Sequence, residues 1–233
     1  MNDRLLFELI EKKQEKLNDL TFSEWRQKLT PNNWRAAIVV EIGEALDSLG
    51  KTTKWWKKNS IDIDNVRVEL IDILHFSVSL LFYIKESDIE EYSSAINGFI
   101  SVLAYDKFTK EEEIIRDDLV ILSSLIFNMR EFMTRLGMLF KEVGFKNMEE
   151  IFKAYMTKNV LNEFRQKHGY KEGTYIKEWL FKEPYGDLYW ESKVEDNVVA
   201  YEIAKQIKAD ENFADNLYKE LEKVYLTISS KGK

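Results

Sequence analysis

The sequence predicts an all-α fold, a helical bundle, and three observations lead to that expectation. The chain of 233 residues contains only 2 Pro and 9 Gly, too few breakers for the many turns of an all-β protein. Apolar residues recur at helical spacing along most of its length. With 45% hydrophobic residues and no internal repeat, the chain has material for one core, so we expect a single domain over residues 1–233.

The first half of the chain begins with two amphipathic helices. Residues 3–20 carry leucines and an isoleucine at helical spacing. Thr30 followed by Pro31 predicts the start of the second helix, because proline costs no hydrogen bond in a first turn. The second pattern stops at Gly50, a residue typical of a helix C-terminus. Residues 51–60 are basic and aromatic, and we expect them to form a loop.

A third helix is expected to lie at the centre of the bundle. It begins at Asp62 or Asp64 and is apolar on most faces as far as Ile84. A helix that is apolar nearly all round is usually buried. A shorter fourth helix is expected over residues 88–104.

Capping signals open the next two expected segments. Thr109 and Glu112 have the spacing of a capping box and precede a long helical segment that runs to about Val143. Asn147 and Glu150 repeat the device in a weaker form, and they open a further helix.

The C-terminal third is less regular. The helix that starts after Asn147 runs to His168 and is stopped by Gly169. Residues 169–196 hold the second proline and are expected to be an ordered excursion, with a possible local insertion at 180–194. Helical periodicity resumes over residues 198–228.

Composition excludes several classes of function. The chain has no Cys, which rules out a disulfide framework, a cysteine nucleophile and a thiolate metal site. The net charge is −7, and an acidic chain is a poor candidate for coating nucleic acid. No long uncharged apolar run predicts a membrane span, and the N-terminal residues lack a signal-peptide core. We therefore expect a cytoplasmic protein without a nucleic-acid or membrane partner.

Paired carboxylates stand on two of the expected helices. Glu41 and Glu44 are three residues apart on the second helix, and Glu69 and Asp72 repeat that spacing on the third. Their neighbours are mostly apolar, and a carboxylate in such surroundings is costly unless it is paired or binds a metal. Two packed helices could aim all four at one point, and oxygen donors of this kind suit Mg²⁺ or Mn²⁺. The alternative is that these acids line solvated helix edges.

A di-iron site fits the sequence poorly. That design needs two Glu-x-x-His motifs, and the chain has only His75 and His168, neither of which follows a glutamate by three. We expect His75 to be a core residue with a satisfied hydrogen bond.

A polar stripe runs along the expected helix 148–168. Tyr155, Lys158, Asn162 and Arg165 fall on one helical face, and a segment rich in lysine, tyrosine and glycine follows. Such residues suit a phosphate-bearing ligand, although an ordinary solvated face would look similar. The bordering and following residues are Asn159, Gln166, Tyr170, Lys171, Gly173 and Tyr175.

Two amides near the N-terminus form a further candidate site. Gln14 and Asn18 are four residues apart, and their side chains can both donate and accept hydrogen bonds, as the polar edge of uracil requires. As isolated residues, they could equally be surface positions.

Together these motifs resemble the dimeric, all-α dUTPase family, which is related to the MazG-like nucleotide pyrophosphohydrolases. The resemblance rests on the two acidic motifs, on Gln14 and Asn18, on Trp55-Trp56-Lys57, and above all on the segment 155–175. The segment 195–197 resembles that family's later acidic element, but residues 180–194 separate it from the rest. Residues 88–145 contribute no motif.

The resemblance implies a fold of the all-α NTP pyrophosphatase type. It implies hydrolysis of dUTP, and of dUDP too, to dUMP by a homodimer that holds two or more Mg²⁺ ions, which Mn²⁺ could replace. For dUTP the second product is pyrophosphate, and water would attack the β-phosphorus.

The resemblance also implies roles for particular residues. The metal ligands would be Glu41, Glu44, Glu69 and Asp72, and Glu41 would also orient or deprotonate the attacking water. Lys158 and Arg165 would stabilise charge in the transition state. The substrate-binding residues would be Gln14, Asn18, Trp55, Trp56, Asn159, Asn162, Tyr170 and Lys171.

Two other functions stay open on the sequence alone. One is a related pyrophosphohydrolase that prefers dCTP or another nucleotide. The other is a non-enzymatic helical interaction protein, whose acidic residues would simply be solvated.

Overall fold

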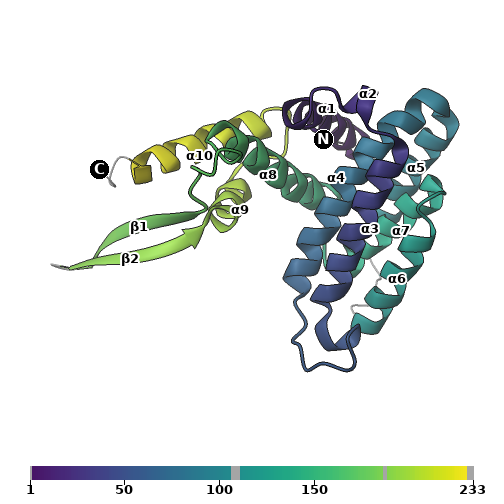
Figure 1. The fold of residues 1–233 in the computed structure, drawn as a ribbon, viewed down its shortest axis with the longest axis horizontal. Coiled ribbons are helices and arrows are strands. Elements are labelled where there is room, and N and C mark those ends of the chain that lie inside the picture. Colours follow the sequence, from purple (N-terminus) through teal and green to yellow (C-terminus); the bar gives the residue numbers. More distant parts are fainter. Residues whose placement is uncertain (1, 106–110, 186–187, 230–233) are drawn as a thin grey trace. The chain divides into compact units, whose positions relative to one another are not determined.

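A computed structural model describes residues 2–105, 111–185 and 188–229 (Figure 1). Within them, the chain forms ten α-helices, one 3₁₀-helix and one two-stranded sheet, so the expected all-α class is confirmed. The contacts group the chain into two compact units: the N-terminal unit, Asn2–Ile151, and the C-terminal unit, Phe152–Lys233. A single domain over the whole chain stays a prediction. Among the described helices, none combines the length and the apolar character needed to cross a membrane.

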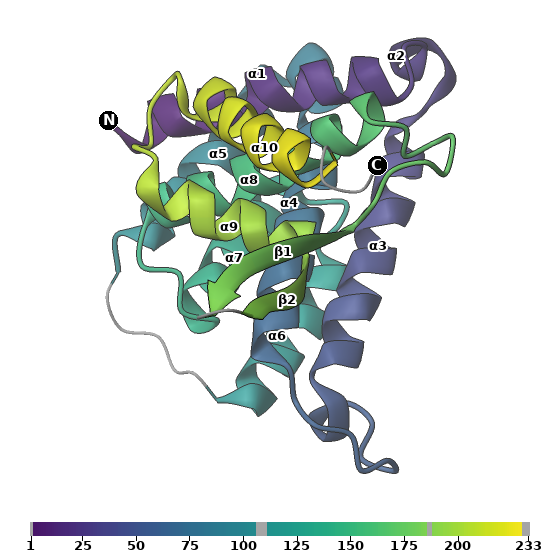
Figure 2. The same ribbon diagram turned by 90° about the vertical axis from the view of Figure 1, so that its left-hand side faces the viewer.

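The N-terminal unit is a helical bundle built around α4. Both views show α3 and α4 side by side over most of their length (Figure 1, Figure 2). Helix α4 also contacts α1, α5 and α7, and more than half of its residues are buried, as its apolar pattern predicted. The elements are α1 (Asp3–Thr21), α2 (Trp25–Lys28), α3 (Pro31–Ser48), η1 (Gly50–Thr52), α4 (Ile63–Ser87), α5 (Ile89–Leu103), α6 (Glu112–Ser124) and α7 (Met129–Glu142).

The predicted start of α4 is confirmed at Asp62. The Asp62 carboxylate accepts a hydrogen bond from the backbone N–H of Asn65 at 2.9 Å, which satisfies one of the unpaired donors of the first turn. Pro31 likewise stands at the start of α3.

The predicted end at Gly50 is also confirmed, and it has a steric reason. Gly50 has φ +52°, and a Cβ atom there would lie 2.2 Å from the carbonyl oxygen of Ser60. Only glycine therefore lets the loop 51–62 close against the end of α3. The loop itself begins with the 3₁₀-helix η1, which periodicity did not indicate.

One prediction in the N-terminal unit needs correction, and one helix was not predicted. The segment from Glu112 to about Val143 is two helices, α6 and α7, because Asn128 caps a new helix by accepting from the N–H of Glu131 at 3.2 Å. The short helix α2 was not anticipated. Thr109, the first residue of the proposed capping box, lies outside the described residues.

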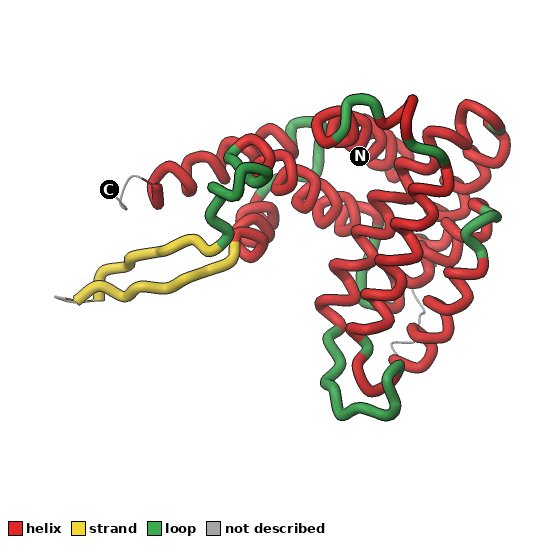
Figure 3. Tube along the Cα trace, in the orientation of Figure 1, coloured by secondary structure: helices red, strands yellow, loops and turns green. Residues whose placement is uncertain are grey.

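The C-terminal unit combines helices with a β-hairpin (Figure 3). Helix α8 (Met148–Lys167) begins in the N-terminal unit and continues here. It is followed by β1 (Glu178–Tyr185), β2 (Leu188–Glu195), α9 (Asp196–Gln206) and α10 (Phe213–Ser229). The strands pair antiparallel, from Glu178 opposite Glu195 to Tyr185 opposite Leu188.

The hairpin and the following helices refine three expectations. Outside residues 186–187, the segment 169–196 is ordered, as predicted, but its strands begin before and end after the proposed insertion 180–194. The helical segment 198–228 is in fact two helices, since residues 207–212 separate α9 from α10. The stop at Gly169 is confirmed: its φ is +89°, and the N–H of Tyr170 bonds back to the carbonyl of Arg165 at 3.0 Å.

Aromatic side chains form the core of the C-terminal unit. The ring of Phe164 on α8 stacks on His168 with centroids 3.9 Å apart, and it contacts both Tyr218 and Tyr225 of α10 at 5.4 Å. Trp179 of β1 packs against the same Tyr225. These contacts join α8, α10 and the base of the hairpin, and so fix the surroundings of the polar residues on α8.

Candidate active site

Three carboxylates of the N-terminal unit converge. Glu41 of α3 and Glu69 and Asp72 of α4 each offer an oxygen atom, and these atoms all lie within 4.8 Å of one another. The cause is the way the two helices are joined: Glu41 lies two turns before the end of α3, and Glu69 lies two turns after the start of α4. Because the two helices pack along their length, those positions face each other. We call these three residues the carboxylate cluster.

Glu44, the fourth predicted ligand, is not part of this convergence. It lies one turn after Glu41 and its side chain is exposed, whereas Glu69 is only 8% exposed. Its role as a ligand stays a prediction. The solvated-edge interpretation of the acidic motifs fits Glu44 but not Glu69.

A hydrogen-bonded support holds Glu69 in place, and sequence reasoning missed it. The amide nitrogen of Asn65 donates to Glu69 Oε1 at 3.0 Å and to Ser48 Oγ at 2.7 Å, which ties the start of α4 to the end of α3. Asn65 precedes Glu69 by four residues, so the spacing was a usable signal.

The carboxylate cluster fits a divalent cation by the chemistry of its donors. Its members offer only hard oxygen ligands, which Mg²⁺ and Mn²⁺ prefer. Three carboxylates so close together repel one another, and a bound cation would relieve that repulsion. No sulfur or imidazole donor belongs to the cluster found in the described residues. The nearby His75 instead bonds the carbonyl of Ile71 through Nδ1 at 2.8 Å and is nearly buried, as expected of a core residue.

The two predicted amides lie in the interior, so they are not ordinary surface positions. Gln14 is 3% exposed and Asn18 is 6% exposed. Both bond the hydroxyl of Ser79 on α4, at 3.1 Å and 3.0 Å. Ser79 follows Asp72 by seven residues, so the amides meet the same side of α4 two turns beyond the carboxylate cluster. Sequence reasoning did not single out Ser79.

The two predicted tryptophans stand on the loop that connects α3 to α4. Trp55 is 82% exposed and Trp56 is 61% exposed, and their rings meet edge to face with centroids 5.6 Å apart. Lys54 forms an ion pair with Asp47 at the end of α3. The loop is thus held at its base while its aromatic rings face solvent.

In the C-terminal unit, a carboxylate from the acidic segment 195–197 holds Arg165 in place. Its Nε and Nη2 atoms donate to the two oxygens of Asp196, at 2.9 Å and 2.7 Å. The hydroxyl of Tyr175 donates to the same carboxylate at 2.8 Å. Asp196 is 1% exposed, so a buried carboxylate forms this bidentate pair with a partly buried guanidinium.

The pKa values in this network follow from burial and pairing. Burial lowers the pKa of Arg165, but the hydrogen bonds and charge of Asp196 outweigh it and leave the pKa above its usual value. Burial and the hydrogen bond to Asp196 raise the pKa of Tyr175. At neutral pH, therefore, the guanidinium is charged and the phenol is neutral.

The other predicted residues of the C-terminal unit are arranged along and just after α8. Asn159 is buried, Lys158 and Asn162 are partly exposed, and Tyr170 and Lys171 are exposed. A ligand role for these residues stays a prediction.

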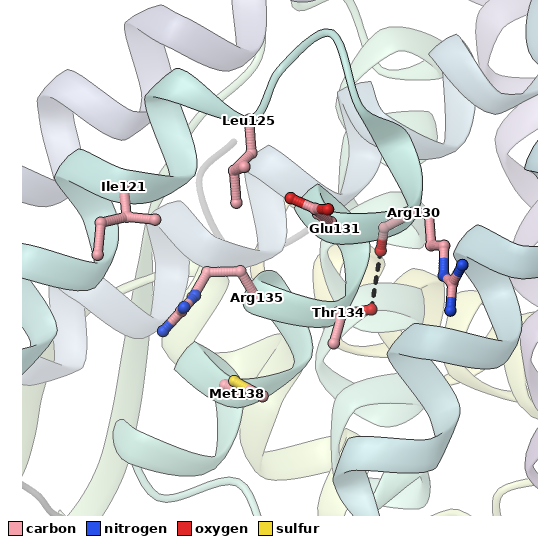
Figure 4. A pocket seen from close by; sticks show the side chains of 7 residues that line it. All are labelled: Ile121, Leu125, Arg130, Glu131, Thr134, Arg135 and Met138. Carbon is pink, nitrogen blue, oxygen red and sulfur yellow. Dashed lines mark hydrogen bonds between the residues drawn. The ribbon is translucent and has the colours of Figure 1, made fainter.

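A cavity of ≈ 600 Å³ in the N-terminal unit involves none of the candidate residues (Figure 4). It lies between α6 and α7 and is lined by Ile121, Leu125, Arg130, Glu131, Thr134, Arg135 and Met138. No motif was found in this part of the sequence, and we assign the cavity no function.

Comparison with known proteins identifies the family. A family model described as dUTPase matches residues 6–170, which include the carboxylate cluster, the amides, the tryptophans and Arg165. No curated protein matches the chain.

Proposed function

This chain belongs to the dUTPase family and is therefore a dUTP diphosphatase, and we propose that it works with Mg²⁺ ions held by the carboxylate cluster. The observation that carries the proposal is the convergence of Glu41, Glu69 and Asp72 within 4.8 Å. We propose Glu44 as a further ligand, two or more Mg²⁺ ions, and Mn²⁺ as a substitute. The substrates are dUTP and also dUDP.

We propose separate roles for the bound cations, for Glu41 and for Glu69. Divalent cations, when bound, offset the charge of the phosphates and orient them. Glu41 orients the attacking water or accepts its proton, so that dUTP and water yield dUMP and pyrophosphate. Glu69, fixed by Asn65, keeps the ligand oxygens in place.

The charges on and after α8 are proposed to act on the phosphates. Lys158, Arg165 and Lys171 are cations, and the pair with Asp196 holds the guanidinium of Arg165 in one orientation. A fixed donor needs little reorganisation when charge develops in the transition state. In this proposal, Asp196 positions Arg165, which is the role we give to the later acidic element.

The uracil ring is proposed to be recognised by amides and packed by an aromatic residue. Gln14 and Asn18 present hydrogen-bonding groups in an interior site. Asn159, Asn162 and Tyr170 complete the proposed binding residues, together with Trp55 or Trp56. A homodimer, which the resemblance implies, completes the proposal, and light scattering coupled to size-exclusion chromatography tests it.

A nucleotide panel tests the proposed function. Pyrophosphate release from dUTP, dCTP and dTTP would be measured with Mg²⁺, with Mn²⁺ and with EDTA, and phosphate release from dUDP in parallel. We expect fast turnover of dUTP that EDTA abolishes and Mg²⁺ restores. Turnover of dCTP or dTTP as fast as that of dUTP would contradict the uracil assignment, and turnover in EDTA would contradict the metal assignment.

A further inference from the structure

An arginine of α6 bonds the loop that carries the two exposed tryptophans. Arg116 Nη1 donates to the backbone carbonyl of Thr52 at 3.2 Å, and Thr52 is the last residue of η1, at the start of that loop. Helix α6 contacts η1 at the end of the bundle where α3 ends and α4 begins (Figure 1). The bond therefore joins the loop to a helix on which the sequence placed no site residue.

The guanidinium of Arg116 is itself held in one orientation. Its Nε and Nη2 atoms lie 2.9 Å and 2.8 Å from Oδ1 of the neighbouring Asp117. Because a guanidinium is planar, two nitrogen atoms fixed on one oxygen also fix the direction of the third. That third nitrogen, Nη1, is the donor to Thr52, so the bond to the loop comes from an oriented group.

The other bonds of the loop fix its two ends to each other and to α3 and α4. The N–H of Lys51 donates to the carbonyl of Asn59 at 3.2 Å, and the N–H of Asp62 donates to the carbonyl of Ser48, the last residue of α3, at 2.9 Å. Among the hydrogen bonds found in the described residues, the one from Arg116 is the bond that joins this loop to any further helix.

The tryptophans depend on the backbone of this loop for their position. Trp55 and Trp56 follow Thr52 by three and four residues, and because both rings are exposed, little packing holds them. A loop that is already fixed loses less conformational entropy when a ligand binds. We infer that Arg116 is a positioning residue that holds Thr52 and thereby keeps the tryptophans where they meet the nucleotide. This inference rests on the proposed function, in which a tryptophan packs on the base.

Trypsin cleavage of the folded protein tests whether Arg116 restrains the loop. Lys57 and Lys58 follow the tryptophans and are exposed, and cleavage after them requires the loop to open locally. Loss of one hydrogen bond should make cleavage there about fivefold faster in Arg116→Ala, as followed by mass spectrometry. Arg116→Lys keeps a donor and should restore slow cleavage.

Arg35→Ala is the matched control. Arg35 of α3 also donates to a backbone carbonyl at an end of α6, that of Ile126, through Nε at 3.4 Å. It is the same kind of bond, but it lies at the opposite end of α6 from Arg116, so its loss should leave loop cleavage and KM unchanged. If Arg116→Ala does not fold, Arg116→Met, which keeps the apolar stem, takes its place.

Steady-state kinetics test whether the restraint serves the substrate. Arg116→Ala should raise KM for dUTP about fivefold and leave kcat within about twofold, because the carboxylate cluster is unchanged. In a chain that already carries Trp55→Ala and Trp56→Ala, Arg116→Ala should raise KM no further, since residues that act through one another are not additive.

The outcomes separate this inference from the proposed function. Equal loop cleavage in wild type and Arg116→Ala, or an equal change in Arg35→Ala, refutes the restraint. Faster cleavage with an unchanged KM, or the same rise in KM with and without the tryptophans, refutes the positioning role. If wild type does not hydrolyse dUTP at all, the proposed function fails, and trypsin cleavage still tests the restraint.

Discussion

The two units of this protein arrange clustered charges in opposite ways. In the N-terminal unit, Glu41, Glu69 and Asp72 bring three like charges within 4.8 Å of one another. In the C-terminal unit, Arg165 and Asp196 bring opposite charges together in a bidentate pair, with Tyr175 as a further donor. The first arrangement gathers charges of one sign, whereas the second one pairs charges of opposite sign.

The difference indicates what each unit contributes. Like charges gathered at one point cost stability unless cations join them, which is why we propose that the carboxylate cluster binds a ligand. A self-neutralising pair holds its members in position and stabilises the fold around them. Arg165 must satisfy both roles, since it is proposed to act on the substrate phosphates and also holds α9 to α8 through Asp196.

The largest effect is expected from Asp196→Ala in the C-terminal unit. Removing the carboxylate leaves the partly buried guanidinium of Arg165 without its partner, so the free energy of unfolding should fall by about 3–5 kcal/mol. Urea unfolding measures it. Glu202→Ala, which removes an exposed ion pair with Lys205 on the same helix, should cost less than about 1 kcal/mol. Equal losses in the two variants would show that the Asp196 pair does not stabilise the unit.

The next largest effect is expected in the carboxylate cluster, and it concerns turnover. Glu69→Gln keeps the size of the side chain but removes a charge, so kcat/KM for dUTP should fall on the order of a hundredfold or more. Asn65→Ala leaves the carboxylate in place and removes only its support, with an expected loss of about tenfold. Glu90→Gln, an exposed acid on α5, is the control. A loss in Glu69→Gln no larger than in Glu90→Gln would remove the cluster from the mechanism.

A third acidic group combines like charges with one opposite charge. We expect it to have a smaller effect on stability, and one that depends on pH. Burial raises the pKa of Glu142 on α7 to about 8, and the charge of Asp118 adds to the rise. Arg135, which donates to Asp118 at 2.9 Å, partly opposes it. Because one guanidinium lies near two carboxylates, their charge is only partly offset. The folded protein therefore keeps a proton on Glu142 that the unfolded chain loses once the pH exceeds the usual pKa of a glutamate.

The sign of the expected pH dependence follows from that proton. Between about pH 5 and pH 8, the unfolded chain binds fewer protons than the folded one, so this group makes the wild type less stable as pH rises. Glu142→Gln cannot titrate, and its stability relative to wild type should grow by about 1 kcal/mol or more over that interval. Urea unfolding at several pH values measures the difference. A difference that stays constant with pH, or one shared by Glu131→Gln on the same helix, would contradict the assignment.

The sequence predicted the N-terminal unit better than the C-terminal one, because its signals are local. The uninterrupted apolar run of α4 and the cap at Asp62 are properties of neighbouring residues, and they identified the central helix. The break at Asn128 was missed because helical periodicity on its two sides is similar. The hairpin was missed because two isolated strands, which pair only with each other, have no sheet whose pattern could reveal them.

Sequence patterns likewise predicted one part of the candidate site and missed another. The spacing of the acidic motifs predicted that carboxylates of α3 and α4 would converge, and three of the four do. The bonds from Gln14 to Ser79 and from Arg165 to Asp196 join residues 65 and 31 positions apart. Helical periodicity cannot indicate a contact between residues so far apart in the sequence. The partners of these side chains therefore became known only from the packing of the helices.

Direct cation binding tests the central claim, that the carboxylate cluster holds the divalent ions on which dUTP hydrolysis depends. Mn²⁺ would be titrated into the wild type and into Glu41→Gln, Glu69→Gln and Asp72→Asn, with free Mn²⁺ followed by its paramagnetic resonance signal. If the claim holds, Mn²⁺ binds, Mg²⁺ displaces it, and Mn²⁺ affinity is weakened about tenfold or more in each of the three variants and unchanged in Glu90→Gln. Equal Mn²⁺ affinity in wild type and all three variants would contradict it.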